Sequence, residues 1–201
     1  YSNHWSRYTG FGNKDSTRGH NRYGALVSYC SFNPQALGNN TYPNLQFKPS
    51  AIAYRTARSY NAISLYLSKS DTGFLAIRSY TNDSLIEVRE FNERVDYKKI
   101  SWNFNQTPKN FNIEFEGESP PELYAISLDN SWGLAMDNIP LRGSAGLVFS
   151  KMDTSLLRKM YQDMNVGMII LQFGGNVVPY MKNFKRYEDI FKRELKVIKS
   201  V

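Results

Sequence analysis

Cysteine and histidine are scarce in this 201-residue sequence, which has one cysteine, Cys30, and two histidines, His4 and His20. A single cysteine excludes an internal disulfide framework and a cysteine-based metal site, so cysteine usage does not identify the redox compartment. Asp129 and Asp137 flank a predicted strand, but no histidine or cysteine lies at a suitable spacing from them. These residues therefore predict no metal site.

Long hydrophobic runs are also absent. No apolar run approaches the roughly 20 residues that a membrane-spanning helix needs, so the sequence predicts no membrane span. The sequence begins with YSNHWSRYTG, without an initiator methionine or a signal peptide. Such a beginning is typical of a processed or trimmed chain whose targeting information has been removed.

Negative charge is outnumbered, with 18 acidic against 25 basic residues and a formal net charge of +7. This excess favours anionic surroundings such as nucleic acid, an acidic glycan or anionic lipid. The basic residues are scattered, however, and the one dense cluster, 182–199, alternates with acidic and apolar residues as on a solvated helix face. We therefore expect no nucleic-acid partner.

Residues 1–121 have the pattern of an antiparallel β-sandwich or jelly roll. Short runs alternate apolar and polar residues, and turn-forming Asp, Asn, Ser and Gly separate them. The chain has 14 tyrosines, 12 phenylalanines and 3 tryptophans, which suit half-buried sheet surfaces and also stack on sugar rings. We predict six or seven strands, drawn from 23–32, 51–57, 61–70, 73–81, 84–92, 98–104 and 110–118.

Residues 122–201 have a different period, in which strands alternate with helices. Strands are predicted at 123–129 and 133–141, a helix at 154–164 with Asp153 as its N-cap, and a buried parallel strand at 166–173. Pro179 then opens a second helix, whose apolar residues recur at a spacing of three to four. The fold class is therefore α+β overall, with a sandwich followed by part of a three-layer α/β domain.

The α/β part is incomplete as a fold. A doubly wound sheet needs about five parallel strands to bury its helices, whereas residues 122–201 supply one fully buried strand, or two. The second helix would then expose a long apolar stripe. We therefore expect the sheet to be completed by residues or a chain outside this one.

Two segments that contain glycine follow predicted strands in this half, NIPLRGSAG at 138–146 and LQFGGN at 171–176. In open α/β sheets, ligands bind beyond the carboxyl ends of the strands. Glycine lets a backbone N–H approach a ligand closely, and an asparagine amide adds a neutral donor. Two such donors aimed at one point stabilise a developing oxyanion by about 3–4 kcal/mol each. Taken alone, Asn176 could equally cap the turn into the next helix.

The segments DNIPLRGSAG and MIILQFGGN resemble the second and third conserved blocks of SGNH/GDSL hydrolases. They are similar to bacterial GDSL-like lipases, acylhydrolases and esterases that carry a β-sandwich module. The resemblance implies an oxyanion hole formed by the Gly146 N–H, Gly174 and the Asn176 side chain, with Gly143 as the alternative glycine. It also implies a flavodoxin-like SGNH domain over 122–201, an acyl-serine mechanism without metal or organic cofactor, and a periplasmic or cell-surface location.

Other blocks of this family are missing. Val177 stands where many members have an aspartate. The serine block has only NKDST at 13–17 as a near match, and Ser16 follows no hydrophobic strand, which makes it a poor nucleophile. The D-x-x-H block that supplies the base is also missing, and His4 and His20 precede every other block. We therefore expect the nucleophile and the base to lie outside this chain, which would be inactive alone.

Three further residues are candidate substrate contacts: Arg142, Gly143 and Trp132. Arg142 lies in the glycine loop, which is the name used below for the segment 138–146. It either holds an anionic substrate group or only braces this loop. Trp132, in the turn DNSWG, either contacts a ligand or fills a core.

The sequence thus predicts an ester hydrolase that acts on an acylated small molecule or glycan, including the removal of acetyl groups from a glycan. Two alternatives stay open. One is a non-catalytic carbohydrate-binding β-sandwich with a supporting α/β segment. The other is an assembly partner whose sheet is completed by another chain.

Overall fold

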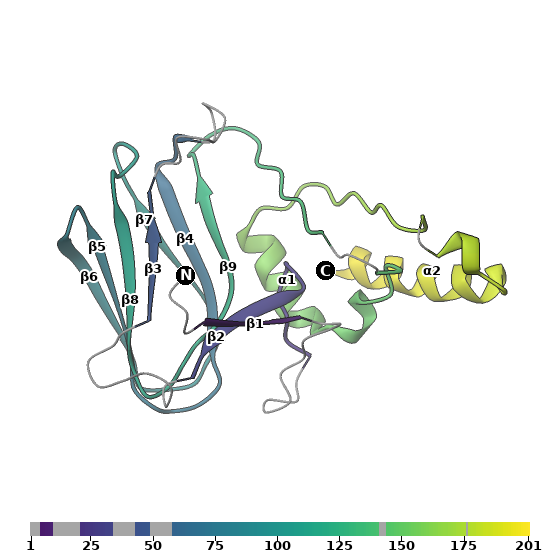
Figure 1. Ribbon diagram of the computed structural model, residues 1–201, viewed down its shortest axis with the longest axis horizontal. Helices are drawn as coiled ribbons and strands as arrows, with labels where there is room; N and C mark the ends of the chain where they lie inside the picture. Colours follow the sequence, from purple (N-terminus) through teal and green to yellow (C-terminus); the bar gives the residue numbers. More distant parts are fainter. Residues whose placement is uncertain (1–4, 10–20, 34–42, 49–57, 141–143, 176) are drawn as a thin grey trace. The chain divides into compact units, whose positions relative to one another are not determined.

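The computed structural model describes residues 5–9, 21–33, 43–48, 58–140, 144–175 and 177–201 (Figure 1). The chain divides into two compact units, one of Tyr1–Arg7 with Tyr29–Met136 and one of Tyr8–Ser28 with Asp137–Val201. The strand predicted at 51–57 lies outside the described residues.

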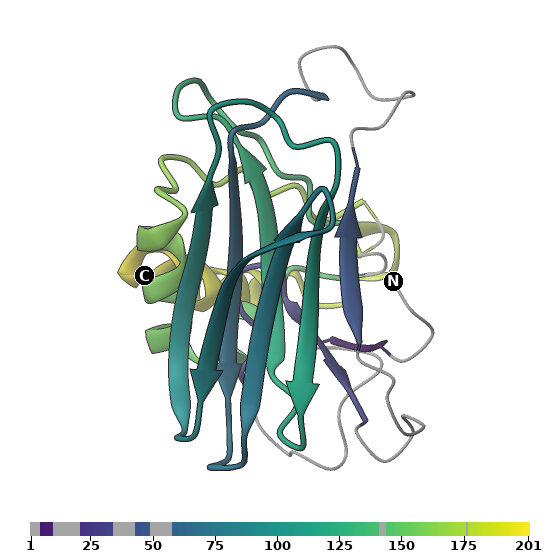
Figure 2. The ribbon, with the colours of Figure 1, turned by 90° about the vertical axis from the view of Figure 1, so that its left-hand side faces the viewer.

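The first unit is an antiparallel β-sandwich of two sheets (Figure 2). The larger sheet has the strand order β1-β2-β9-β4-β7 and the smaller one β3-β8-β5-β6. In chain order the strands are β1 (Trp5–Thr9), β2 (Ser28–Phe32), β3 (Asn44–Phe47), β4 (Ala62–Lys69), β5 (Leu75–Thr81), β6 (Ser84–Phe91), β7 (Val95–Asn103), β8 (Phe111–Gly117) and β9 (Glu122–Asp129). Together with the two α-helices of the described residues, these strands confirm the α+β class predicted from the sequence.

The alternation of side chains along each strand places one face in the core between the sheets. In β4, Ile63, Leu65 and Leu67 are fully buried in one cluster with residues of β5 and β8. Leu65 lies opposite Ile100 on β7 and Ile126 on β9. Burying each such aliphatic side chain contributes about 1.5–3 kcal/mol, so the period-2 pattern of the sequence directly specifies the core.

A two-residue turn joins β5 to β6 and fixes their register. Asn82 and Asp83 have φ angles of +47° and +66°. A type I′ hairpin turn requires this left-handed conformation, and asparagine and aspartate tolerate it. Thr81 and Ser84 pair directly across the turn, which confirms the turn predicted from the sequence.

The end of β4 carries a buried ammonium group. Lys69 is completely buried, and its Nζ donates to the backbone carbonyl oxygens of Asp71 at 2.7 Å and Glu93 at 3.0 Å. The Asp71 carboxylate lies 3.5 Å from this nitrogen and accepts hydrogen bonds from Ser119 Oγ and the Gly73 N–H. Burial raises the pKa of Asp71, but these hydrogen bonds and the charge of Lys69 hold that pKa below its ordinary value overall.

The strand predicted at 123–129 belongs to the sandwich rather than to the second half of the chain. It forms most of β9, which lies between β2 and β4 in the larger sheet. It pairs antiparallel with β4 along its whole length and with β2 at Leu123, opposite Cys30. The predicted boundary between residues 121 and 122 thus falls inside the first unit, which extends to Met136.

The strand predicted at 133–141 is wrong over its described residues. Residues 133–140 form no strand, and the side chains of Leu134 and Met136 are 98% and 89% exposed. An apolar run forms a strand only where a neighbouring strand offers backbone partners.

The second unit contains the helix predicted after Asp153. This helix, α1 (Thr154–Asp163), begins where Asp153 accepts a hydrogen bond from the Leu156 N–H at 3.0 Å. The same carboxylate pairs with Arg22 at 2.9 Å. The helix and its N-cap are thus confirmed, and the buried side chains of α1, Leu156, Leu157 and Met160, form one apolar face.

The buried parallel strand predicted at 166–173 is wrong. The described residues of 137–201 contain no strand, so this segment has no neighbour with which to form a ladder of backbone hydrogen bonds. Val166 and Ile169 are each 40% exposed, and Met168 and Ile170 are each 79% exposed. A continuous apolar run becomes a buried strand only where other elements cover both of its faces.

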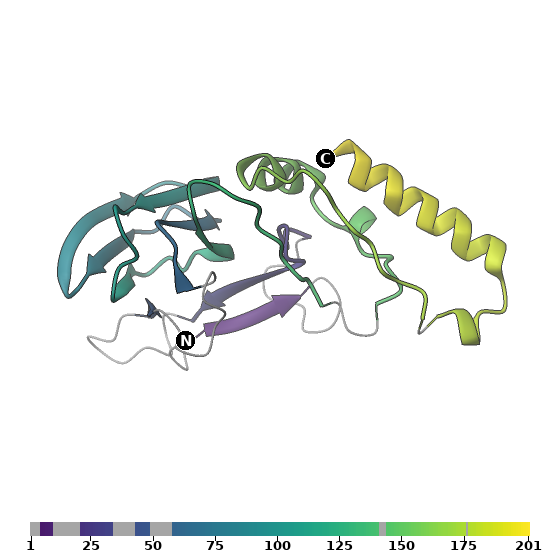
Figure 3. The same ribbon diagram turned by 90° about the horizontal axis from the view of Figure 1, so that it is seen from above.

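The second predicted helix begins later than expected. Pro179 lies in the short 3₁₀ helix η4 (Val178–Tyr180), and α2 (Phe184–Ser200) starts where Asn183 accepts a hydrogen bond from the Arg186 N–H at 2.9 Å. Figure 3 shows α2 as one uninterrupted helix. Within the described residues, no helix combines the length and the apolar character that crossing a membrane requires.

Candidate functional site

Part of the predicted site can be placed. The residues that lie outside the described ones are Arg142, Gly143, Asn176, Ser16, His4 and His20. Gly146 and Gly174 are described, and both belong to the second unit. Trp132 belongs to the first unit and is 84% exposed, so it fills no core.

The segments that carry Gly146 and Gly174 lie together in the second unit. A Cβ atom at Gly146 would be 2.6 Å from Cδ2 and 2.8 Å from Cγ of Phe173, the residue before Gly174. It would also be 3.0 Å from Cε2 of Phe191 on α2. Carbon atoms in contact prefer separations of about 3.5–4.0 Å. Only glycine therefore permits the Phe173 ring to lie against position 146.

Both glycines also have backbone conformations that favour glycine. The φ angle is +74° at Gly146 and +114° at Gly174, a region that residues with a Cβ atom rarely adopt. The Gly174 carbonyl oxygen accepts hydrogen bonds from the N–H groups of Val177 and Val178, both at 2.9 Å. The turn after Phe173 is thus closed by backbone hydrogen bonds.

The Gly146 N–H, which is the predicted oxyanion donor, has a local acceptor. It donates to Ser144 Oγ at 3.1 Å. A serine hydroxyl is a neutral acceptor on a side chain that can rotate, whereas hydrogen bonds to an ionised acceptor are roughly twice as strong. An oxyanion placed here would therefore displace Ser144 Oγ.

A tyrosine of α2 holds the same loop from the other side. Tyr187 Oη donates to the carbonyl oxygen of Ala145 at 2.8 Å. The Tyr187 ring stacks on Phe191, with centroids 5.8 Å apart and planes at 16°. Phe191 in turn meets Phe173 edge to face, with centroids 6.4 Å apart. Aromatic contacts and one hydrogen bond thus join Ala145, Phe173 and α2.

A buried carboxylate forms a second link between α2 and this loop. Glu194 is 2% exposed and accepts hydrogen bonds from the Ser150 N–H at 2.8 Å and from Ser150 Oγ. Ser150 lies in the 3₁₀ helix η3 (Phe149–Lys151), which follows the glycine loop. Hydrogen bonds to a charged group contribute about 1.5–3 kcal/mol, so Glu194 fixes this end of the loop firmly.

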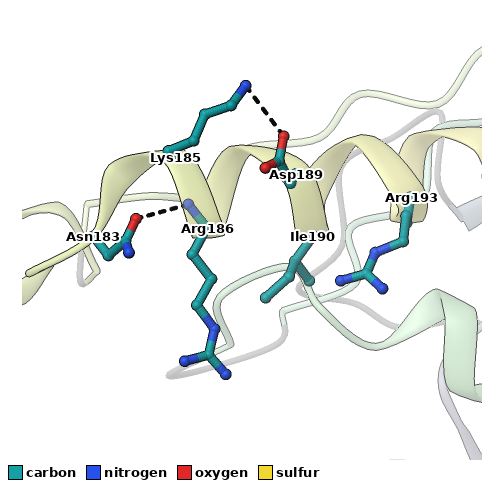
Figure 4. Close-up of a pocket in the computed structure, with 6 residues that line it drawn as sticks. All are labelled: Asn183, Lys185, Arg186, Asp189, Ile190 and Arg193. Carbon is teal, nitrogen blue, oxygen red and sulfur yellow. Dashed lines mark hydrogen bonds and ion pairs between the residues drawn. The ribbon is translucent and has the colours of Figure 1, made fainter.

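The remaining surface of α2 is cationic and solvated. Figure 4 shows Arg186, Ile190 and Arg193 on one side of the helix. These three residues line an open concavity of about 480 Å³. Lys185 pairs with Asp189 at 3.2 Å, and this hydrogen bond is the main cause of the raised pKa of Lys185. These exposed, partly paired charges confirm the solvated helix face predicted for the basic cluster.

The described residues contain no group of three or more histidine, cysteine, aspartate or glutamate side chains that could hold a metal ion. Two residues of this site, Tyr187 and Phe191, belong to the predicted second helix, whose apolar spacing places them on one face but does not assign them to the site. Glu194 had no distinguishing signal, because it is one acid among the basic residues of 182–199.

Comparisons with known proteins do not assign the chain to a family. No protein-family model matches the sequence, and no curated protein matches it. Among solved structures, one match is the M60 catalytic domain with the CBM51-1 and CBM51-2 domains from Clostridium perfringens ZmpB. The match has 8% sequence identity and a TM-score of 0.34, and it covers 51% of this chain and 11% of that one. A similarity at this level supports no conclusion about function.

Proposed function

We propose that this chain forms the oxyanion-binding part of an ester hydrolase of the SGNH/GDSL type, which acts on an acylated small molecule or glycan. The observation that carries the proposal is the packing of Phe173 against Gly146. It brings together the two segments that resemble the second and third blocks of the family, although they are distant in sequence. Each segment contributes a glycine with positive φ, at positions 146 and 174.

The proposed reaction needs donors at the point where negative charge develops. A serine hydroxyl attacks the ester carbonyl carbon while a histidine accepts the serine proton. The carbonyl oxygen becomes an oxyanion, to which the Gly146 N–H and the Asn176 side-chain amide donate hydrogen bonds. The tetrahedral intermediate then expels the alcohol, which takes the proton from the histidine. Water releases the acid from the acyl-serine by the same route.

The serine and the histidine of this proposal lie outside the 201 residues, since the family's serine and D-x-x-H blocks have no good match among them. The exposed apolar side chains of Val166, Met168, Ile169 and Ile170 fit this assignment. A parallel strand of an α/β sheet is apolar on both faces, because neighbouring strands and helices cover it. In the proposal, residues outside this chain provide that cover.

The test is hydrolysis of p-nitrophenyl acetate by the full-length protein. We expect Asn176→Ala to lower kcat about 10²–10³-fold with little change in KM, because the amide acts on the transition state. The matched control is Asn105→Ala, which removes an exposed amide from the first unit and should retain wild-type kcat. Unchanged kcat in Asn176→Ala would overturn the assignment of the oxyanion-binding site. A wild-type protein that does not hydrolyse p-nitrophenyl esters would overturn the proposal that the protein is a hydrolase.

The outer face of the smaller sheet favours a second candidate function, non-catalytic carbohydrate binding. Arg78 on β5 donates to Glu116 Oε2 on β8 from Nε at 2.9 Å and from Nη2 at 2.7 Å. Beside it, Asn112 Nδ2 donates to Glu114 Oε1 at 3.2 Å, and Tyr80 lies opposite Asn112 in the strand register. Guanidinium, carboxylate and amide groups bind sugar hydroxyls, and a tyrosine ring stacks on sugar rings.

Binding to a glycan array distinguishes this second candidate. If the sheet face binds glycans, the 201-residue chain should bind, Tyr80→Ala should lose binding, and Asn176→Ala should retain it. Glycan binding that Tyr80→Ala leaves intact would exclude this face as the binding site.

A further inference from the structure

The peptide group between Ala145 and Gly146 is held from both of its ends. Its carbonyl oxygen accepts the hydrogen bond from Tyr187 Oη at 2.8 Å, and its N–H donates to Ser144 Oγ at 3.1 Å. A peptide group is planar, and in the trans form its C=O and N–H point in opposite directions. A group that fixes the direction of the carbonyl therefore also fixes the direction of the N–H.

The hydroxyl of Tyr187 has a defined position because its ring is packed. The ring stacks on Phe191, and Phe191 contacts Phe173 edge to face. Phe173 and Phe191 are also the two side chains that a Cβ atom at Gly146 would meet. The Tyr187 side chain and the peptide group that accepts its hydrogen bond thus both pack against the Phe191 ring, which in turn contacts Phe173.

A second contact, from Glu194, fixes the position of α2 relative to the loop at 145–150. Glu194 follows Tyr187 by seven residues, which is about two helical turns, so both side chains leave α2 on the same side. Glu194 binds Ser150, and Tyr187 binds Ala145, at the two ends of one short loop. Rotation or sliding of α2 would break both links together.

We infer that Tyr187 is a positioning residue of the oxyanion hole, whose hydroxyl aims the Gly146 N–H at the oxyanion. This inference rests on the proposed function. A hydrogen bond to the carbonyl also polarises the peptide group, which makes its N–H a stronger donor. Tyr187 touches no reacting atom in this arrangement and acts only through the peptide.

The variant Tyr187→Phe tests the inference, because it keeps the ring and removes only the hydroxyl. In the full-length protein, we expect kcat for p-nitrophenyl acetate to fall about fivefold to tenfold with KM unchanged, the effect of losing one neutral hydrogen bond in the transition state. The matched control is Tyr161→Phe, which makes the same change on α1 of the same unit and should retain wild-type kcat. Far-UV circular dichroism establishes that both variants are folded.

An NMR measurement on the 201-residue chain gives a readout that needs no activity. The backbone amide signal of Gly146 should shift more in Tyr187→Phe than in Tyr161→Phe, because only the first loses the bond to the Ala145 carbonyl. Equal Gly146 shifts would overturn the inference, and so would a normal kcat in Tyr187→Phe when Asn176→Ala is impaired. An Asn176→Ala variant with normal kcat would overturn the oxyanion-binding site itself, and the Gly146 signal would then test only the hydrogen bond from Tyr187 to the Ala145 carbonyl oxygen.

Discussion

Replacing Gly146 with alanine should destabilise the second unit, because the new methyl group has no room. Its carbon would lie 2.6 Å from the Phe173 ring, and overpacking of this kind costs about 1–3 kcal/mol. A φ angle of +74° adds about 1–2 kcal/mol for a residue with a Cβ atom. We therefore expect Gly146→Ala to lower the free energy of unfolding by about 2–5 kcal/mol.

A double-mutant cycle with Phe173→Ala separates the two costs. Without the Phe173 ring, the steric cost at that ring disappears, whereas the 3.0 Å contact with Phe191 and the backbone cost remain. Gly146→Ala should therefore cost about 1–3 kcal/mol less in the Phe173→Ala background. Urea unfolding followed by the helical circular dichroism signal reports on the right unit, because α1 and α2 both belong to it. An equal cost in both backgrounds would refute the packing of Phe173 on Gly146.

Two further predictions concern carboxylates that accept hydrogen bonds, Glu194 and Asp71. Glu194→Gln should lower the free energy of unfolding of the second unit by about 1–3 kcal/mol, because Ser150 loses a charged hydrogen-bond acceptor. The control Glu188→Gln, on the exposed face of α2, should change this free energy by less than about 0.5 kcal/mol. Equal effects of the two variants in urea titrations would contradict the prediction. Asp71→Asn should make the free energy of unfolding of the first unit fall less in acid than it does in the wild-type protein. The pKa of Asp71 is lower in the folded state, so its contribution is fully present above the unfolded pKa of about 3.9 and is lost as the pH falls through the folded value. Tryptophan-monitored urea midpoints between about pH 2 and 6 test it, and parallel curves for wild type and variant would contradict it.

The sandwich could be predicted largely from local patterns. The alternation of core-facing and outward-facing side chains in β4 depends on residues only a few positions apart, as does the Asn82–Asp83 turn. Both can therefore be predicted from the local sequence. The strand β3 (Asn44–Phe47) was not predicted, because four residues are too few to form a pattern. Only its pairing with β8, far along the chain, defines it.

The second half could be predicted less well because its apolar runs depend on what covers them. Residues 166–173 have the composition of a buried strand but form no strand among the described residues. The run at 123–129 does form a strand, but its place in the sheet comes from partners on β4 and β2. Composition shows that a segment is apolar, whereas its neighbours decide where it lies.

The candidate site, like the fold, could be predicted from the sequence only in part. Sequence reasoning paired the loops of Gly146 and Gly174, and the structure brings them together through Phe173 rather than through strand ends. The spacing on α2 identified Tyr187 as part of an apolar face. That its hydroxyl reaches the Ala145 carbonyl depends on how α2 lies on the loop, which no local pattern specifies.

The central claim is that the loops at 144–146 and 173–176 bind one oxyanion. The most direct measurement is a crystal structure of the full-length protein after reaction with diethyl p-nitrophenyl phosphate, which phosphorylates activated serines. We predict a phosphoryl oxygen about 2.7–3.1 Å from the Gly146 nitrogen and from the Asn176 amide nitrogen. A serine adduct whose phosphoryl oxygen contacts neither group, or a protein that forms no adduct, would contradict the account.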